Sequence, residues 1–327
     1  MPPARSRRAA RAAAGAGAAA AAVTGAQAGG AAGGVPGATG KAGARTGSSV
    51  LAEVIGWFRP ASLAELHRGL TTPPAAGAAA ARAEAAADAG RPFDLRPAWV
   101  LLAAAVLLIA MEYGGYSSNF RHWFPTASND AHWGALYGML WWAGVRVAGF
   151  VVFPMIAVAL LFDEPLAAFG LRLRGAGRHL PVYAVLFGLV APLVLAFSFT
   201  EGFRATYPFY RLAGRSALDF VLWEHAYIWQ FFGVEFFFRG FLLHGTKRRL
   251  GAYSVAVSVV PYVMIHFGKP LPEVCGAVVA GTVLGVLSLR TGSIWAGFLI
   301  HVSVAVSMDV LSLLHGLPPA ATKFAWL

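Results

Sequence analysis

Ionisable side chains that can carry out acid–base chemistry lie within or beside long apolar runs in the last third of the sequence. They are Glu235, Arg239, His266, Glu273 and His301. An ionisable group in the hydrocarbon core of a membrane is costly, so we expect each to face another such group or a water-filled cavity. Glu and His can exchange protons, and Arg supplies a fixed positive charge. These residues are therefore candidates for a functional site inside a membrane.

Simpler roles are open for the same residues. Glu235 and Arg239 are four positions apart, which places them about 6 Å from each other on one helix face, where they would form a mutually neutralising ion pair. Each histidine can be a hydrogen-bonded packing residue. Glu273 follows Pro270 and Pro272 and so opens a helix, where a carboxylate suits the positive end of the helix dipole.

Three sequence blocks occur in a fixed order around these residues: Gly233-Val-Glu-Phe-Phe-Phe-Arg-Gly240, Tyr262-Val-Met-Ile-His-Phe-Gly-Lys-Pro270, and Gly292-Ser-Ile-Trp295 leading to His301. Together they resemble the CPBP family of intramembrane proteases, also called Abi or CAAX-protease-like. The resemblance covers about Leu218 to Leu314. It implies an endopeptidase that hydrolyses peptide bonds of membrane-associated or exported peptides through a Glu/His site.

The sequence departs from the family pattern at two positions. Val234 occupies the place of the first glutamate of the motif Glu-Glu-x-x-x-Arg, and Ala305 occupies the place of the Asn or Asp that follows the last histidine by four residues. The resemblance therefore also allows a catalytically inactive member that acts as a membrane scaffold or immunity protein. A transporter or channel whose buried polar groups line a path is a further alternative.

The family resemblance implies either of two mechanisms. In a metal-dependent version, Glu235, His266 and His301 hold a zinc ion and Glu273 acts as the base. In a version without a cofactor, Glu235 takes the proton from water, His266 orients that water and His301 donates to the oxyanion, while Arg239 keeps Glu235 ionised. The metal-free version is favoured because no HExxH or HxxxH pair is present.

The elements that must position these residues are long apolar runs, which begin at Pro97. Seven of them are candidate membrane spans, given that a spanning helix needs about 20 residues. They are Pro97–Met111, Ala135–Leu161, Leu180–Phe199, Leu218–Leu243, Ala252–Phe267, Val274–Leu289 and Ser293–Leu314. We therefore expect an all-α polytopic membrane protein of about seven transmembrane helices with a disordered N-terminal tail. Counting 1.5 Å per residue from the expected span ends separates Glu235 from His266 by about 16 Å in depth.

Composition agrees with a membrane protein. Hydrophobic residues make up 57% of the 327 positions and charged residues only 13%, against about 45–50% and about 25% in soluble domains. The basic excess, 26 against 15 acidic residues, lies between apolar runs, which favours retention on the cytoplasmic side of a bilayer over nucleic-acid binding. The single cysteine, Cys275, excludes a disulfide framework.

The expected organisation has four parts: a low-complexity Ala/Gly/Arg-rich disordered tail over 1–95, N-terminal transmembrane helices over 96–215, the CPBP-like core over 216–316, and a short tail over 317–327. Within the first part, the Ser62-x-x-Glu65 pattern after Trp57 and Phe58 predicts a short docking helix or a local turn. Charge places the N-terminus in the cytoplasm. The expected location is the cytoplasmic (inner) membrane of a bacterium, and the expected partners are the lipid bilayer and a peptide or protein substrate.

Overall fold

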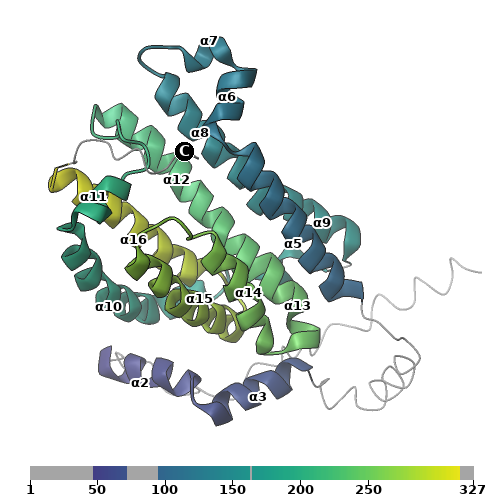
Figure 1. Cartoon of the computed structure of the whole chain (residues 1–327). Coiled ribbons are helices and arrows are strands. Elements are labelled where there is room, and N and C mark those ends of the chain that lie inside the picture. Colours follow the sequence, from purple (N-terminus) through teal and green to yellow (C-terminus); the bar gives the residue numbers. More distant parts are fainter. Residues whose placement is uncertain (1–46, 72–94, 163, 317–327) are drawn as a thin grey trace, which may run out of the picture. The chain divides into compact units, whose positions relative to one another are not determined.

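The computed structural model describes residues 47–71, 95–162 and 164–316 (Figure 1). Within these ranges the chain is helical and has no strand, apart from an isolated bridge between Leu171 and Ser293. The predicted C-terminal tail and most of the predicted N-terminal tail lie outside the described residues.

The helices that precede the predicted core are α5 (Leu95–Gly114), the continuous α8–η2–α9 (Gly134–Val147, Ala148–Val152, Phe153–Leu161) and α10 (Leu180–Ser198). Shorter elements connect them: α6 (Ser117–Trp123), α7 (Pro125–Ser128), η3 (Leu166–Phe169), η4 (Ala176–His179) and α11 (Glu201–Thr206). The core consists of the continuous α12–η5–α13 (Ala217–Glu235, Phe236–Leu242, Leu243–Leu250), α14 (Tyr253–Met264), α15 (Leu271–Thr291) and α16 (Trp295–Leu314).

Each predicted span corresponds to a helix, and the all-α polytopic membrane fold is confirmed. Among the described residues, five stretches are long and apolar enough to cross a membrane: Leu95–Gly114, Gly134–Leu161, Ala176–Ser198, Leu271–Thr291 and Trp295–Leu314. The other two predicted spans differ from these for clear reasons. The α12–η5–α13 helix carries the ionisable residues of the site, and α14, with 12 residues, is shorter than a full crossing requires. The total of seven stays a prediction.

The core helices pack around the continuous α12–η5–α13 helix. Its α12 part contacts α8 and α16, its α13 part contacts α14, and its η5 part contacts α14 and α15, while α10 packs on α16 and α14 packs on α15 (Figure 1). The phenylalanine-rich block after Glu235 supplies the centre of this packing, because Phe236, Phe237 and Phe238 are completely buried. The site residues are therefore set in a tightly packed part of the bundle, in which their geometry is well constrained.

The segment that follows Glu235 is a π-helix, η5, which interrupts the α-helical hydrogen-bond pattern over seven residues. Such segments are rare and often occur at functional sites. Two neighbouring helices bond to its backbone: Ser258 Oγ of α14 donates to the Phe238 carbonyl at 2.8 Å, and Ser288 Oγ of α15 donates to the Arg239 carbonyl at 3.3 Å. The π-helical turn is thus fixed by side chains from outside its own helix.

A helical hairpin occupies part of the predicted disordered tail. Residues 47–71 form α2 (Gly47–Trp57) and α3 (Pro60–Thr71). Val50 and Val54 of α2 are buried in a cluster with residues of α10, α15 and α16. The expectation of a disordered tail over 1–95 is therefore wrong for this stretch, because these larger side chains supply the burial that the Ala/Gly-rich sequence around them lacks.

Polar contacts fasten the hairpin to the core. Arg290, in the last turn of α15, donates through Nη2 to the Trp57 carbonyl at 3.1 Å and to Ser62 Oγ at 2.7 Å. Ser62 was predicted to cap a helix, but α3 begins two residues earlier, at Pro60, a residue type suited to a first helical turn. The Ser62 hydroxyl thus contributes to docking and does not start the helix.

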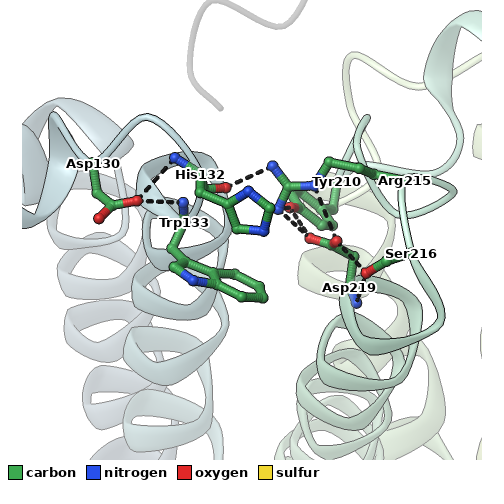
Figure 2. A network of polar contacts seen from close by, with 7 residues as sticks. All are labelled: Asp130, His132, Trp133, Tyr210, Arg215, Ser216 and Asp219. Atoms are coloured by element: carbon green, nitrogen blue, oxygen red, sulfur yellow. Dashed lines mark hydrogen bonds and ion pairs between the residues drawn. The ribbon is translucent and has the colours of Figure 1, made fainter.

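A network of polar contacts joins the N-terminal ends of α8 and α12 (Figure 2). Arg215 donates to both carboxylate oxygens of Asp219, at 3.0 and 2.6 Å, and to the backbone carbonyl of His132 at 2.6 Å. Ser216 caps α12 by accepting from the Asp219 amide, and the Tyr210 hydroxyl donates to Asp219 at 2.6 Å. Burial and this hydrogen bond raise the pKa of Tyr210 to about 12. The N-terminal end of the helix that carries Glu235 is therefore held against the N-terminal end of α8.

Candidate active site

A carboxylate–histidine pair forms the centre of the site. Glu235, in the last turn of α12, is completely buried, and its Oε1 accepts a hydrogen bond of 2.9 Å from Nδ1 of His301 on α16. Because a carboxylate oxygen only accepts, the proton of the neutral imidazole lies on Nδ1. The Nε2 atom of His301 is then left with a lone pair that can take a proton.

Arg239 lies on the π-helical turn beside this pair. Its Nη1 is 3.1 Å from Glu235 Oε1, which is the ion pair that the sequence spacing predicted. Its guanidinium carbon lies 4.0 Å from the centre of the Tyr262 ring, a cation–π contact. Both terminal nitrogens are buried and form no hydrogen bond with any described residue. The ion pair and the ring contact therefore hold the guanidinium in place, and its terminal N–H groups can still donate hydrogen bonds to a bound molecule.

His266 lies in the turn after α14 and is oriented by backbone. Its Nδ1 donates to the Tyr262 carbonyl at 2.7 Å, so its Nε2 is also left as an acceptor. The Tyr262 ring lies 4.7 Å from the His266 ring and 6.2 Å from the His301 ring, between centroids. Tyr262 thus contacts Arg239 and both histidines, and the structure brings four of the five predicted site residues together around it.

Glu273, the fifth predicted residue, belongs to a different cluster. Its carboxylate accepts from the Tyr207 hydroxyl at 2.6 Å and forms an ion pair of 2.7 Å with Lys269. No contact between Glu273 and Glu235 or either histidine is found among the described residues. Through Tyr207, Glu273 links the start of α15 to the segment that precedes α12.

The donor set does not fit a zinc ion in this arrangement. Within the described ranges, no three His, Cys, Asp or Glu side chains are grouped so that they could hold a metal. Glu235 is hydrogen-bonded to His301 and paired with Arg239, so it does not stand beside His266 and His301 as a third ligand. The zinc site on these three residues stays a prediction.

Two further residues shape the site and were not recognised in the sequence. A Cβ atom on Gly297 of α16 would lie 2.8 Å from Glu235 Oε2, closer than real Cβ contacts. The ring of Phe231, one helical turn before Glu235, lies 4.5 Å from the His301 ring. The signal for Gly297 is its position four residues before His301, which places both on one face of an apolar helix.

The two departures from the family pattern are filled by apolar packing. Val234 is 2% exposed and belongs to the cluster of the phenylalanine block, while Ala305 is 3% exposed and packs with the aromatic residues between α8 and α12. No polar group takes their place at these two positions.

The fold and the site define a polytopic helical membrane protein with a buried Glu–His–Arg centre. Residues 216–307 match the family model described as Type II CAAX prenyl endopeptidase Rce1-like. This match includes Glu235, Arg239, His266 and His301, and it confirms the resemblance to the CAAX-protease-like family. Neither the curated proteins nor the solved structures contain a match to this chain.

Proposed function

We propose that the protein is an intramembrane endopeptidase that hydrolyses peptide bonds of membrane-associated or exported peptides. The observation that carries this proposal is the buried 2.9 Å hydrogen bond between Glu235 and His301, beside the N–H groups of Arg239 that form no hydrogen bond. A base oriented by a carboxylate next to a cationic donor is the arrangement that amide hydrolysis requires. The family match over residues 216–307 supports the same reaction class.

His301 is the base in this proposal. Its Nε2 takes a proton from the attacking water, and Glu235 stabilises the imidazolium that forms, because the carboxylate already accepts from Nδ1. The same proton is then available at Nε2 for the leaving amine. These catalytic roles differ from those expected from the sequence, in which Glu235 was the base and His301 donated to the oxyanion. The reason for the change is that the hydrogen bond to Glu235 places the His301 proton on Nδ1.

Arg239 and His266 complete the reaction. The terminal N–H groups of Arg239 stabilise the oxyanion of the tetrahedral intermediate, a task for which a buried, preorganised cation is effective. His266 orients the water, since its Nε2 can accept the second water hydrogen while Nδ1 is held by the Tyr262 carbonyl. A zinc-dependent mechanism with His266, His301 and Glu235 as ligands would require Glu235 to leave its bonds to His301 and Arg239, and it is the alternative that chelation tests.

A catalytically inactive scaffold or immunity protein is the second candidate function. The observation that favours it is the burial of Val234 and Ala305 in apolar clusters, where family members carry polar side chains. The four polar residues retained around Tyr262 favour the enzyme, because buried ionisable groups are costly without a function.

The described helices and the family match support a multi-pass membrane protein. We place it in the cytoplasmic membrane of a bacterium, with the bilayer and a peptide substrate as partners. The basic residues Lys247, Arg248 and Arg249 end α13, and Arg290 lies in the last turn of α15. Their position indicates that these helix ends face the cytoplasm.

The test is proteolysis of a quenched peptide library by the purified protein in detergent, with and without a chelator. We expect His301→Gln and Glu235→Gln to abolish cleavage, and His225→Ala, which alters an exposed histidine of the same helix, to retain it. Unchanged cleavage in the presence of chelator supports the metal-free mechanism, whereas its loss supports zinc. Cleavage that survives both site substitutions would overturn the assignment, and no cleavage by any well-folded form would favour the inactive scaffold.

A further inference from the structure

Two acidic residues, Glu224 and Asp309, lie along the same contact between α12 and α16 as the Glu235–His301 pair, but outside the site described above. Glu224 precedes Glu235 by eleven residues, which is close to three helical turns, and Asp309 follows His301 by eight, a little more than two turns. The contact between the two helices thus contains two groups of polar side chains. The group with Glu224 and Asp309 lies about 16 Å along α12 from the Glu235–His301 pair, toward the N-terminal end of that helix.

The second pair is almost completely buried. Asp309 is 0% exposed and Glu224 is 6% exposed. Trp223 donates from Nε1 to Asp309 Oδ2 at 2.7 Å. The other Asp309 oxygen and both Glu224 oxygens are buried and accept no hydrogen bond from a donor group of the described residues. Such unpaired oxygens in an apolar interior are costly, so they point to an occupant.

Trp223 is the neighbour of Glu224 on α12, so its bond to Asp309 places both carboxyl groups at the same part of the contact between α12 and α16. An ionised carboxylate has no donor, so the two groups can hydrogen-bond to each other only if one of them carries a proton. Two ionised carboxylates in contact would repel each other without solvent to screen them. We propose that Glu224 and Asp309 bind one proton between them, forming a carboxyl–carboxylate site in the membrane interior.

The surroundings favour a proton over a metal cation. The pair offers three free oxygens, whereas hard cations such as Ca²⁺ take six to eight. The rings of Trp223 and Tyr227 stack at 4.8 Å beside the pair, which keeps water away. Among the described residues, Tyr207, Tyr227 and Lys269 lie within electrostatic range of the pair, and Glu273 lies within range of the two tyrosines.

The nearby cation does not replace the proton. Lys269 forms its ion pair with Glu273 at 2.7 Å and also donates to the Tyr207 hydroxyl at 3.2 Å. It therefore neutralises Glu273, and without a proton the Glu224–Asp309 pair would carry two uncompensated negative charges, whereas one bound proton reduces this to one. Removal of that proton would place two negative charges in contact on α12 and α16 and would favour separation of the two helices at this level. The proposal is independent of the proposed peptidase activity, because it does not involve Glu235 or either histidine.

Infrared spectroscopy of the full-length protein in detergent at neutral pH tests this site. Carbon-13 labelling of Glu or Asp carboxyl groups, in separate samples, identifies a protonated carboxyl by the shift of its C=O band. We expect the wild type to show such a band and both Glu224→Gln and Asp309→Asn to lose it. Glu235→Gln, which alters the ion-paired carboxylate, and Glu201→Gln, at an exposed position of α11, are expected to keep it.

Absence of a protonated-carboxyl band in the folded wild type would overturn the proposal, and that measurement needs no variant. A band that persists in both Glu224→Gln and Asp309→Asn would also overturn it. A thermal midpoint that rises with sodium chloride but not with a bulky organic chloride at equal ionic strength would identify a metal cation as the occupant instead. Circular dichroism of each variant establishes that the comparison is made on folded protein.

Discussion

Gly297 lies against the carboxylate of Glu235, one helical turn before His301. A side chain on Gly297 would approach Glu235 Oε2 to 2.8 Å at its first carbon, while Oε1 accepts from His301 at 2.9 Å. One turn of α16 thus contacts both oxygens of the buried carboxylate, through bare backbone on one side and through an imidazole on the other. The orientation of Glu235 depends on the absence of a side chain at position 297.

Gly297→Ala is therefore expected to impair the proposed peptidase without unfolding the protein. Displacement of Glu235 by about 1 Å would reduce cleavage about 100-fold, while alanine itself favours a helix. Peptide cleavage and thermal unfolding in detergent measure the two effects. Gly188→Ala is the matched control, because a Cβ there meets nothing within 4 Å. Equal cleavage by both variants would show that position 297 does not position Glu235.

Loss of the hydroxyl groups that bond to the π-helix should destabilise the protein and reduce cleavage together. Ser288→Ala removes the donor to the Arg239 carbonyl and leaves the buried His244 Nε2 without its 3.1 Å partner. An unsatisfied buried group costs about 1–3 kcal/mol, so the midpoint of unfolding should fall. Ser307→Ala removes only a bond within α16, to the Ser303 carbonyl, and is expected to have a smaller effect. A Ser288→Ala variant as stable and active as the wild type would refute this role.

Stability should decrease in acid through Glu164, which lies outside the spanning helices. A hydrogen bond from Arg96 is the main reason that the pKa of Glu164 is lowered, and the charge of Arg248 adds to it. Because the folded pKa lies below the unfolded value of about 4.3, this stabilisation is present above that value and is lost as pH falls through the folded pKa. The effect is at most about 1 kcal/mol, because both side chains are partly accessible to solvent, which screens the pair. Thermal midpoints of wild type and Glu164→Gln should converge in acid, whereas a constant difference would exclude this cause.

Arg290→Ala should release the α2–α3 hairpin from the core. The substitution removes the bonds to the Trp57 carbonyl and to Ser62 that fasten the hairpin to α15. Limited proteolysis followed by mass spectrometry should show faster cleavage within 47–71 than in the wild type. Arg174→Ala, which alters an exposed arginine of a connecting segment, serves as the control. Unchanged protection in Arg290→Ala would mean that apolar packing of Val50 and Val54 holds the hairpin without help.

The sequence predicted the helices, and it grouped four ionisable residues that the structure brings together, because apolar runs and buried charges are both easily recognised. Arg239, His266 and His301 contact Tyr262, and Glu235 is bonded to His301 and paired with Arg239. Glu273 was grouped with them as an ionisable residue beside an apolar run and as the base of the metal-dependent version. Its actual partners, Tyr207 and Lys269, depend on how a connecting segment folds back, which no local pattern records.

The depth estimate that separated Glu235 from His266 assumed that Leu218 lies at the membrane surface. The helix runs from Ala217 to Leu250, longer than the expected span to Leu243, so Glu235 lies near its middle. The π-helical segment was also not predicted, because its hydrogen-bond pattern depends on partners such as Ser258 and Ser288 that come from other helices.

The π-helical turn makes this helix intolerant of changes in length. Before the turn, Glu235 must face α16, and after it, Lys247 must reach His244, whose ring contacts Ser288 on α15. Deleting a single residue within 236–242 would restore a regular α-helix and remove the wide turn that carries Arg239, whereas inserting one would rotate everything beyond it by about 100°. Loops absorb insertions and deletions freely, yet here one residue fewer would displace Arg239 and one more would turn the second half of the helix away from its partners. Natural variants of this chain should therefore differ in length almost everywhere before they differ between Glu235 and Lys247.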